Sequence, residues 1–350
     1  MSTTDDVPEP VAAAYALDRS SIQRIVSLIN LTFSASRVGN GQRLIVQRLH
    51  PVFDASLHHD VFAITQHLKA CGLETPELVT TADGQLWFEA GNEVWRAQTH
   101  IPGSTVHRVT SPAMARSAGC MVAKFHRCLS NFEHTFAFER GGVHDTQQHL
   151  ERLREARKRA RDRGDRETCD LAGSILAAAE TVELDFSSQP RRLCHGDLKI
   201  SNVLFQQLDP PVARCLIDLD TLGYLPLAHE LGDALRSWCN PGNEDSTTAH
   251  LEPALFEAAL DGYAEAAPEN ITAAEWSSVV PGLSCICLEL AARFCVDAVE
   301  DSYFGWDPSR FATRREHNLE RARGQLSLAK SVTGQRGVLE GVVRSLLPTT

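Results

Sequence analysis

Two short polar segments, each beside an apolar run, constrain the fold of this chain more than any other feature. Residues 193–202 read Leu-Cys-His-Gly-Asp-Leu-Lys-Ile-Ser-Asn, and residues 216–221 read Leu-Ile-Asp-Leu-Asp-Thr. A packed core has no use for carboxylates and a carboxamide beside apolar strands, and two close carboxylates repel one another unless a cation lies between them. The pattern therefore predicts a loop and a strand that both end at a metal-dependent catalytic site.

Asp197, Lys199, Asn202 and Asp218 are the groups that a Mg-ATP phosphotransferase needs. Asp197 could accept the proton of an attacking hydroxyl, and Lys199 could neutralise charge on the transferring phosphoryl group. Asn202 and Asp218 could hold Mg²⁺ against the ATP phosphates. Protein kinases place this chemistry in H-R-D-x-x-x-x-N followed by D-F-G, whereas this chain has H-G-D-L-K-x-x-N followed by I-D-L-D-T. An H-G-D triplet alone is also a common turn, but the added lysine, asparagine and strand-ending aspartate favour catalysis.

At these residues the chain resembles the aminoglycoside phosphotransferase/choline kinase superfamily, which consists of small-molecule kinases with a protein-kinase-like fold. Within it the chain is most similar to the N-acetylhexosamine 1-kinases, because I-D-L-D-T stands in place of I-D-x-G and Gly-Asp-Ala-Leu-Arg follows at residues 232–236. Tyr303-Phe304 ahead of residues 317–323 belongs to the same pattern. The resemblance implies ATP as co-substrate, Mg²⁺ as cofactor and a sugar or amino sugar hydroxyl as acceptor. An aminoglycoside- or choline-type acceptor is the alternative.

The resemblance also implies an α+β fold of the bilobal protein-kinase type, with a small antiparallel-sheet N-lobe and a larger, mostly helical C-lobe. A chain of 350 residues exceeds what one hydrophobic core usually holds, which agrees with two lobes. We expect a disordered tail over residues 1–15, the N-lobe over 16–100 and the C-lobe over 101–350. Strands are expected near 25–29, 31–36, 44–49, 78–80, 86–89 and 94–98, with a helix over 56–71.

The C-lobe is expected to contain helices over residues 111–131, 145–166, 226–239, 253–266, 273–300 and 308–333. The second of these is rich in both arginine and acidic residues, which is typical of a solvated helix with i,i+4 ion pairs rather than a nucleic-acid surface. In the long apolar segment near residue 290, Glu289, Arg293 and Asp297 recur every four residues. Such a charged stripe either lines a cavity or pairs internally, and the sequence leaves both open.

The nucleotide site departs from the usual kinase pattern. No G-x-x-x-x-G-K-[ST] or strand-linked G-x-G-x-x-G occurs, and the resemblance places the triphosphate under the loop near Asn30 and Thr32. The third strand has Gln47-Arg48 where a lysine is usual, so Arg48 is the candidate phosphate anchor unless Gln47 points inward. If it does, a catalytically weak, ATP-binding regulatory protein becomes possible. Adenine is expected at the last N-lobe strand, where Gln98 is the candidate contact.

The acceptor site is assigned mainly by resemblance. In the hexosamine kinases an arginine and a tyrosine contact the sugar at the positions that Arg293 and Tyr303 resemble, with Asp297 as a nearby acid. Asp220 either supports the metal ligands without binding the metal itself or contacts a substrate hydroxyl.

Composition excludes several other classes of protein. A net charge of -11 argues against nucleic-acid partners and anionic membrane surfaces. The ten cysteines form no C-x-x-C pair, which favours reduced thiols in a cytoplasmic enzyme over a zinc or disulfide framework.

Overall fold

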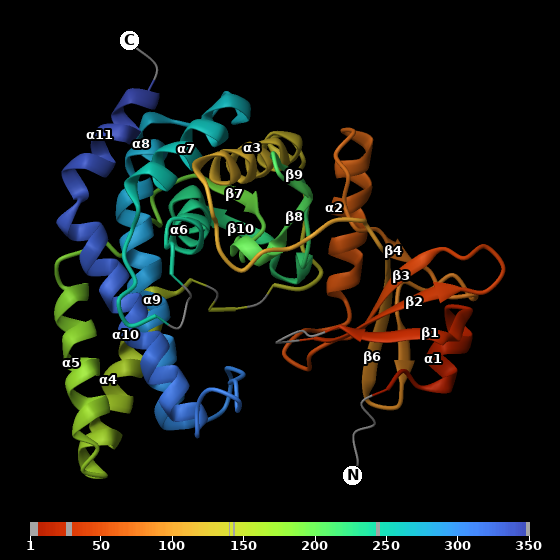
Figure 1. Cartoon of the computed structure of the whole chain (residues 1–350), viewed down its shortest axis with the longest axis horizontal. Coiled ribbons are helices and arrows are strands. Elements are labelled where there is room, and N and C mark those ends of the chain that lie inside the picture. The colour runs from red at the N-terminus through yellow and green to blue at the C-terminus, as the bar shows by residue number, and fades with distance from the viewer. Residues whose placement is uncertain (1–5, 26–29, 140, 143, 243–245, 348–350) are drawn as a thin grey trace. The chain divides into compact units, whose positions relative to one another are not determined.

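The computed structural model describes residues 6–347 except 26–29, 140, 143 and 243–245 (Figure 1). Its internal contacts divide the chain into two compact units. The sheet unit comprises Met1–Pro102, Asn131–Arg140 and Ile217–Leu222, and the helical unit comprises Gly103–Ser130, Gly141–Leu216 and Gly223–Thr350. The predicted α+β class is confirmed. The boundary predicted at residue 100 is close, but the sheet unit also takes in two later segments.

The sheet unit is built on an antiparallel sheet with the strand order β1-β2-β3-β6-β4, in which β5 also pairs with β6. Two helices accompany it (Figure 1). The strands are β1 (Leu17–Ile25), β2 (Leu31–Arg37), β3 (Arg43–Arg48), β4 (Leu78–Val79), β5 (Phe88–Ala90) and β6 (Glu93–Thr99), and the helices are α1 (Glu9–Ala14) and α2 (Leu57–Ala70). The strand predicted at 25–29 lies outside the described residues except for Ile25, which ends β1.

Apolar and polar residues alternate along the strands, so the sheet has one apolar and one polar face. Val46 and Trp95 lie in a buried core on the apolar face, together with Val11 and Tyr15 from the α1 segment. Tyr15 is fully buried, and its hydroxyl donates a hydrogen bond to the Trp95 carbonyl at 3.2 Å. The disorder predicted for residues 1–15 is therefore wrong for residues 9–15, because an apolar pattern too short to stand out supplies part of this core. The opposite face carries buried polar side chains: Thr32, Ser34, Arg96 and Gln98.

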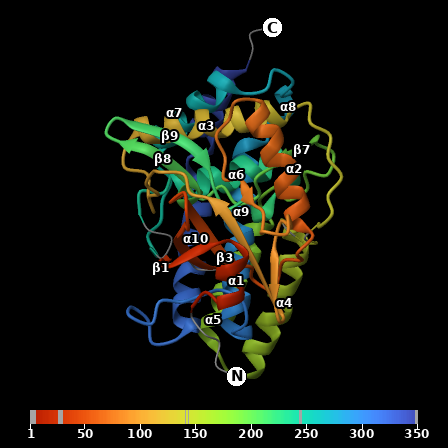
Figure 2. The same cartoon turned by 90° about the vertical axis from the view of Figure 1, so that its right-hand side faces the viewer.

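The helical unit packs most of its helices around α9. Helices α4, α5, α6 and α10 all contact α9, while α3 and α7 pack against each other and lie side by side in both views (Figures 1 and 2). The helices are α3 (Pro112–Leu129), α4 (Thr146–Asp162), α5 (Arg166–Ala179), α6 (Leu227–Trp238), α7 (Pro253–Ala266), α8 (Ala273–Ser277), α9 (Val279–Glu300), α10 (Arg314–Gly334) and α11 (Arg336–Leu346). The short strands β7 (Arg191–Cys194), β8 (Val203–Leu208), β9 (Pro211–Leu216) and β10 (Gly223–Pro226) pair as β7–β10 and β8–β9.

Helix α9 is long and apolar enough to span a membrane by length and composition alone. However, 83% of its most apolar window is buried inside the structure, as in the core helix of a soluble protein. The single helix predicted over 273–300 is divided into α8 and α9 at Ser278, and α8 begins with a capping box between Thr272 and Glu275.

Candidate active site

The predicted catalytic loop follows β7 in the helical unit. Gly196 has a φ of 80°, a left-handed conformation that favours glycine, and it turns the chain directly after His195. The loop ends in a short 3₁₀ helix, Ile200–Asn202. The turn brings the side chains on its two ends, Asp197 and Asn202, into contact.

Asp197, Lys199 and Asn202 form one hydrogen-bonded group. The Lys199 ammonium lies 2.6 Å from Oδ2 of Asp197. The Asn202 amide nitrogen donates to the same oxygen at 3.1 Å and to the Asp197 carbonyl at 2.8 Å. Burial raises the pKa of Asp197, but Lys199, with the charges of His195 and Arg236, lowers it further, and the net pKa is lowered. Asp197 is therefore an ionised acceptor at neutral pH, and its side chain is 25% exposed.

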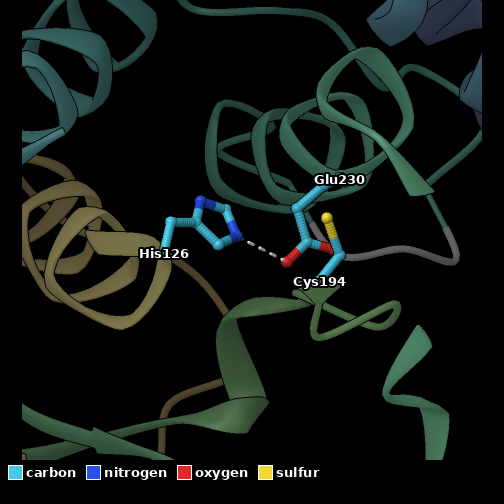
Figure 3. A group of neighbouring side chains, drawn as sticks. All are labelled: His126, Cys194 and Glu230. Carbon is cyan, nitrogen blue, oxygen red and sulfur yellow. Dashed lines mark hydrogen bonds and ion pairs between the residues drawn. The ribbon is translucent and has the colours of Figure 1, made fainter. Parts of the chain in front are cut away.

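A buried glutamate on α6 fixes the backbone of this loop. The two carboxylate oxygens of Glu230 accept hydrogen bonds from the backbone N–H groups of His195 at 2.8 Å and Gly196 at 2.9 Å. The imidazole of His126 lies 3.1 Å from the first oxygen (Figure 3). Burial raises the pKa of Glu230, but the contact with His126 and further charges lower it overall. The sequence analysis missed this residue, although an acid among the apolar positions of α6 was an available signal.

His126 and Glu230 also lie near Cys194, so that ligand-type atoms of all three fall within 4.8 Å of one another (Figure 3). Such a group could hold a metal ion. Its bonding favours a structural role instead, because both oxygens of Glu230 already accept backbone N–H groups. Burial raises the pKa of the Cys194 thiol well above its usual value, so the sulfur is not an anionic ligand.

Two further residues of α6 hold the loop. The indole N–H of Trp238 donates to the Leu198 carbonyl at 2.8 Å, and the Ser237 hydroxyl accepts the N–H of Ile200 at 2.9 Å. Together with Glu230, these contacts make α6 the support on which Asp197 is oriented.

In the sheet unit, the predicted metal ligand Asp218 has a left-handed backbone with a φ of 66° and directly precedes a 3₁₀ turn, Leu219–Thr221. Leu219 packs with Leu57 and Val61 of α2 in a small core. The segment that carries Asp218 is therefore anchored by the two residues that follow it, Leu219 through apolar packing and Asp220 through polar contacts.

Asp220 is the centre of a buried ionic network. Its carboxylate lies 2.5 Å and 2.9 Å from the two terminal nitrogens of Arg96, and Asn30 donates to it at 2.8 Å. Only 1% of the Arg96 side chain and 2% of the Asp220 side chain are exposed. Burial raises the pKa of Asp220, but Arg96 and Asn30 lower it overall. The predicted contact of Asp220 with substrate stays a prediction, and the structure gives both of its oxygens protein partners.

Gln47, not Arg48, lies on the polar face of the sheet. Gln47 is the register partner of Arg96, whose guanidinium donates to the Gln47 side-chain oxygen at 2.8 Å and 3.0 Å. Arg48 takes the opposite parity and pairs with Glu93 at 2.7 Å. The alternation imposed by buried Val46 explains the difference. The sequence analysis missed Arg96, because nothing along the strand distinguishes it from an exposed arginine.

Protein kinases pair the strand lysine with a glutamate of the neighbouring helix, but neither His58 nor Asp60 of α2 takes that role. His58 is fully buried and stacked on Trp87, and burial together with Arg96 lowers its pKa to about 4, so it is uncharged. Asp60 instead accepts hydrogen bonds from His134 and from the backbone of residues 137 and 138. It therefore ties a later segment of the sheet unit to α2.

The predicted acceptor-binding residues lie in α9 and in the segment that follows it. Arg293 lies 3.6 Å from Glu289 and over the ring of Phe304, against which the exposed Tyr303 packs edge-on. Asp297 has a different environment. Its two oxygens accept backbone N–H groups of residues 302, 303 and 304 and the amide of Asn318. Its predicted substrate contact stays a prediction, while its visible role is to shape the turn that carries Tyr303.

Fold and site together define a kinase-like phosphotransferase. Residues 22–269 match the phosphotransferase enzyme family known as APH, and the chain belongs to this family. An amicoumacin kinase solved with AMP-PNP and Ca²⁺ has a TM-score of 0.63 at 12% identity, over 91% of each chain. An aminoglycoside phosphotransferase from Alicyclobacillus acidocaldarius scores 0.60 at 18% identity, over 96% of this chain and 98% of the other. A microcompartment-associated aminopropanol kinase scores 0.61 at 14% identity, over 94% and 97%.

The structural likenesses confirm the predicted protein-kinase-like fold, and the family match confirms the predicted class of enzyme. The structural likenesses do not test the predicted sugar acceptor, because identities this low carry no information on the acceptor. Closeness to the N-acetylhexosamine 1-kinases stays a prediction.

Proposed function

We propose that this protein transfers the γ-phosphoryl group of Mg-ATP to a hydroxyl group of a small molecule. The observation that carries the proposal is the Asp197–Lys199–Asn202 group, held by α6 in a chain that belongs to a phosphotransferase family. Asp197 accepts a hydrogen bond from the attacking hydroxyl, orients it, and takes its proton late in the transfer, because the transition state is loose and positioning dominates. Lys199 offsets the charge that remains on the transferring group.

The donor set supports a hard divalent cation such as Mg²⁺. The Asn202 nitrogen is engaged by Asp197, so its amide oxygen is the atom suited to a metal, and Asp218 supplies a carboxylate. We propose these two residues as metal ligands. When bound, the ion would neutralise phosphate charge. The polar face of the sheet unit, with Thr32, Gln98 and the Asn30 segment, is our proposed source of nucleotide contacts. Arg48 is not proposed as the phosphate anchor, because it lies on the opposite face of β3 and pairs with Glu93.

For the acceptor, we propose a sugar or amino sugar phosphorylated at its anomeric hydroxyl. The support is the sequence pattern around Arg293 and Tyr303, together with their shared packing on Phe304. The second candidate class comprises the aminoglycoside- and amino-alcohol-type acceptors named for the structural relatives and the choline-type acceptor implied by the resemblance. It is supported by fold alone.

The proposal is tested by Asp197→Asn. This change removes the base but keeps the size of the side chain, so turnover should fall by at least about a hundredfold. Binding of Mg-ATP, measured by calorimetry, should change by less than about threefold. A variant that turns over within threefold of the parent would show that Asp197 is not the base. Loss of Mg-ATP binding would show instead that Asp197 holds the metal.

A further inference from the structure

The helical unit contains a buried polar cluster made by His144, His229, Asp233, Glu289 and Arg293. His229 and Asp233 are one turn apart on α6, and Glu289 and Arg293 are one turn apart on α9. His144 lies just before Asp145, the N-cap residue of α4. The imidazole of His144 lies 3.2 Å from Glu289, and its ring centroid lies 5.5 Å from that of His229. Three separate segments therefore converge on one point.

Close approach of α6 and α9 makes this convergence possible. A Cβ atom added to Gly282 of α9 would lie 2.2 Å from the carbonyl oxygen of Ala228 on α6. One added to Gly232 would lie 2.8 Å from the backbone of Gly282. Only glycine fits at either position, so the two helices touch through their backbones where they carry the cluster.

Three polar atoms of the cluster are buried without a partner. Nε2 of His144, Nε2 of His229 and Oδ2 of Asp233 have no hydrogen-bond partner among the described residues. The side chains of His144 and Asp233 are each 7% exposed, and His229 is 8% exposed. Folded proteins leave few such groups unsatisfied, because each one costs free energy. Unsatisfied atoms on three side chains of one cluster are groups that a bound hydroxyl group or water could satisfy.

The cluster is connected to the catalytic loop through α6. His229 directly precedes Glu230, which holds the loop backbone. Asp233 pairs with Arg236 at 2.9 Å, and the charge of Arg236 is one of those that lower the pKa of Asp197. A molecule bound at the cluster would therefore be near the predicted base.

The chemistry of the cluster selects among acceptors. Arg236 offsets the negative charge of Asp233, and Arg293 and His144 offset that of Glu289. The cluster therefore has no excess negative charge to attract a polycation. Its ring contacts within the described residues are His144 with His229, the edge-on pair of Phe186 with His229, and Phe304 with Arg293. The Phe304 face is covered by that guanidinium, so these rings do not form a cage for a quaternary ammonium group. A hydroxyl group both donates and accepts, so it can satisfy a carboxylate oxygen or an imidazole nitrogen.

We propose that His144, His229 and Asp233 form a subsite that binds the hydroxyl groups of an uncharged, polyhydroxylated acceptor. This inference rests on the proposed kinase function and names the residues and the class of acceptor for it. Glu289 orients His144 in this subsite, and Arg293, which pairs with Glu289, lies beside it.

His229→Leu is the sharpest test, because Nε2 of His229 has no hydrogen-bond partner among the described residues. The full chain is assayed for ADP release with D-glucose, D-galactose, N-acetyl-D-glucosamine and myo-inositol, and with choline and kanamycin as cationic probes. With the best polyol, KM should rise at least about fivefold in the variant, while KM for Mg-ATP stays within twofold of the parent. The melting temperature of the acceptor-free protein should stay the same or rise, because an unsatisfied buried group is removed.

The matched control is His149→Gln, which removes a nearby imidazole that already bonds to the Gly142 carbonyl at 3.2 Å. Its KM for the polyol should match that of the parent. Phosphorylation of only choline or kanamycin would overturn the class of acceptor but leave the kinase function standing. An unchanged polyol KM in His229→Leu would show that the three atoms bind structural water. Failure of the parent to bind or hydrolyse Mg-ATP would instead refute the proposed function itself.

Discussion

Replacing Arg96 by methionine should destabilise the sheet unit strongly. The change leaves Asp220 as a buried carboxylate with Asn30 as its remaining side-chain donor, and it also removes both donors to the Gln47 oxygen. Breaking one partner out of a buried ion pair costs about 3–5 kcal/mol, a large share of a total stability of about 5–15 kcal/mol. If the whole chain melts as one unit, the melting temperature should fall by about 4–7 °C, and by more if the sheet unit melts alone.

Arg48→Met is the matched control, since it removes the neighbouring arginine of the same sheet. In the pair of Arg48 with Glu93, 25% of the Arg48 side chain and 37% of the Glu93 side chain are exposed. Loss of this pair should therefore cost only about 0–1 kcal/mol. Urea unfolding followed by far-UV circular dichroism, together with amide hydrogen exchange in β3 and β6, measures both variants. A double variant, Arg96→Met with Asp220→Leu, should recover part of the loss because no buried charge is left unpaired.

Equal effects of Arg96→Met and Arg48→Met would refute the reasoning. They would mean that the buried Arg96–Asp220 pair contributes no more to the free energy of unfolding than an exposed pair does. A double variant less stable than Arg96→Met alone would show that Asp220 stabilises the 3₁₀ turn through other contacts.

Three further outcomes follow from the site. Asp218→Ala should abolish the Mg²⁺-dependent thermal stabilisation by ATP, and calorimetry showing parental Mg-ATP affinity would assign the metal to another carboxylate. Arg293→Ala should raise KM for a sugar acceptor at least about tenfold with KM for ATP unchanged, whereas unchanged sugar kinetics would remove Arg293 from the acceptor site. Glu230→Gln should lower the melting temperature at pH 7. Because the folded pKa of Glu230 is lowered, this difference is complete above the ordinary value of 4.5 and should shrink as pH falls through the folded value. A difference that stays constant from pH 7 down to the onset of acid unfolding would contradict this.

The elements that local pattern determines were predicted from the sequence. Helix α7 was predicted with its observed bounds and α6 within a residue at each end, because their apolar positions repeat at the helical period and their ends carry proline or a polar turn. The contact between Asp197 and Asn202 also followed from spacing, since a glycine turn and a short 3₁₀ helix connect them. Helix α11 was missed because only Leu339 and Val343 are buried on it, and helix α5 because small residues dilute its pattern.

The residues that hold the site in place could not be predicted in the same way, because their partners are distant in sequence. Arg96 and Asp220 are 124 residues apart, and Glu230 reaches the catalytic loop 34 and 35 residues earlier in the chain. A charged residue inside an apolar pattern indicates that some partner must exist, since an unpaired buried charge is too costly. It does not say which one. In both units the same physical solution appears: a buried carboxylate, with its pKa lowered by the donors around it, fixes the segment that carries a predicted catalytic or metal-binding aspartate. The signal to search for in such chains is therefore the charged residue that interrupts an apolar helical pattern near the motif, as Glu230 does in α6.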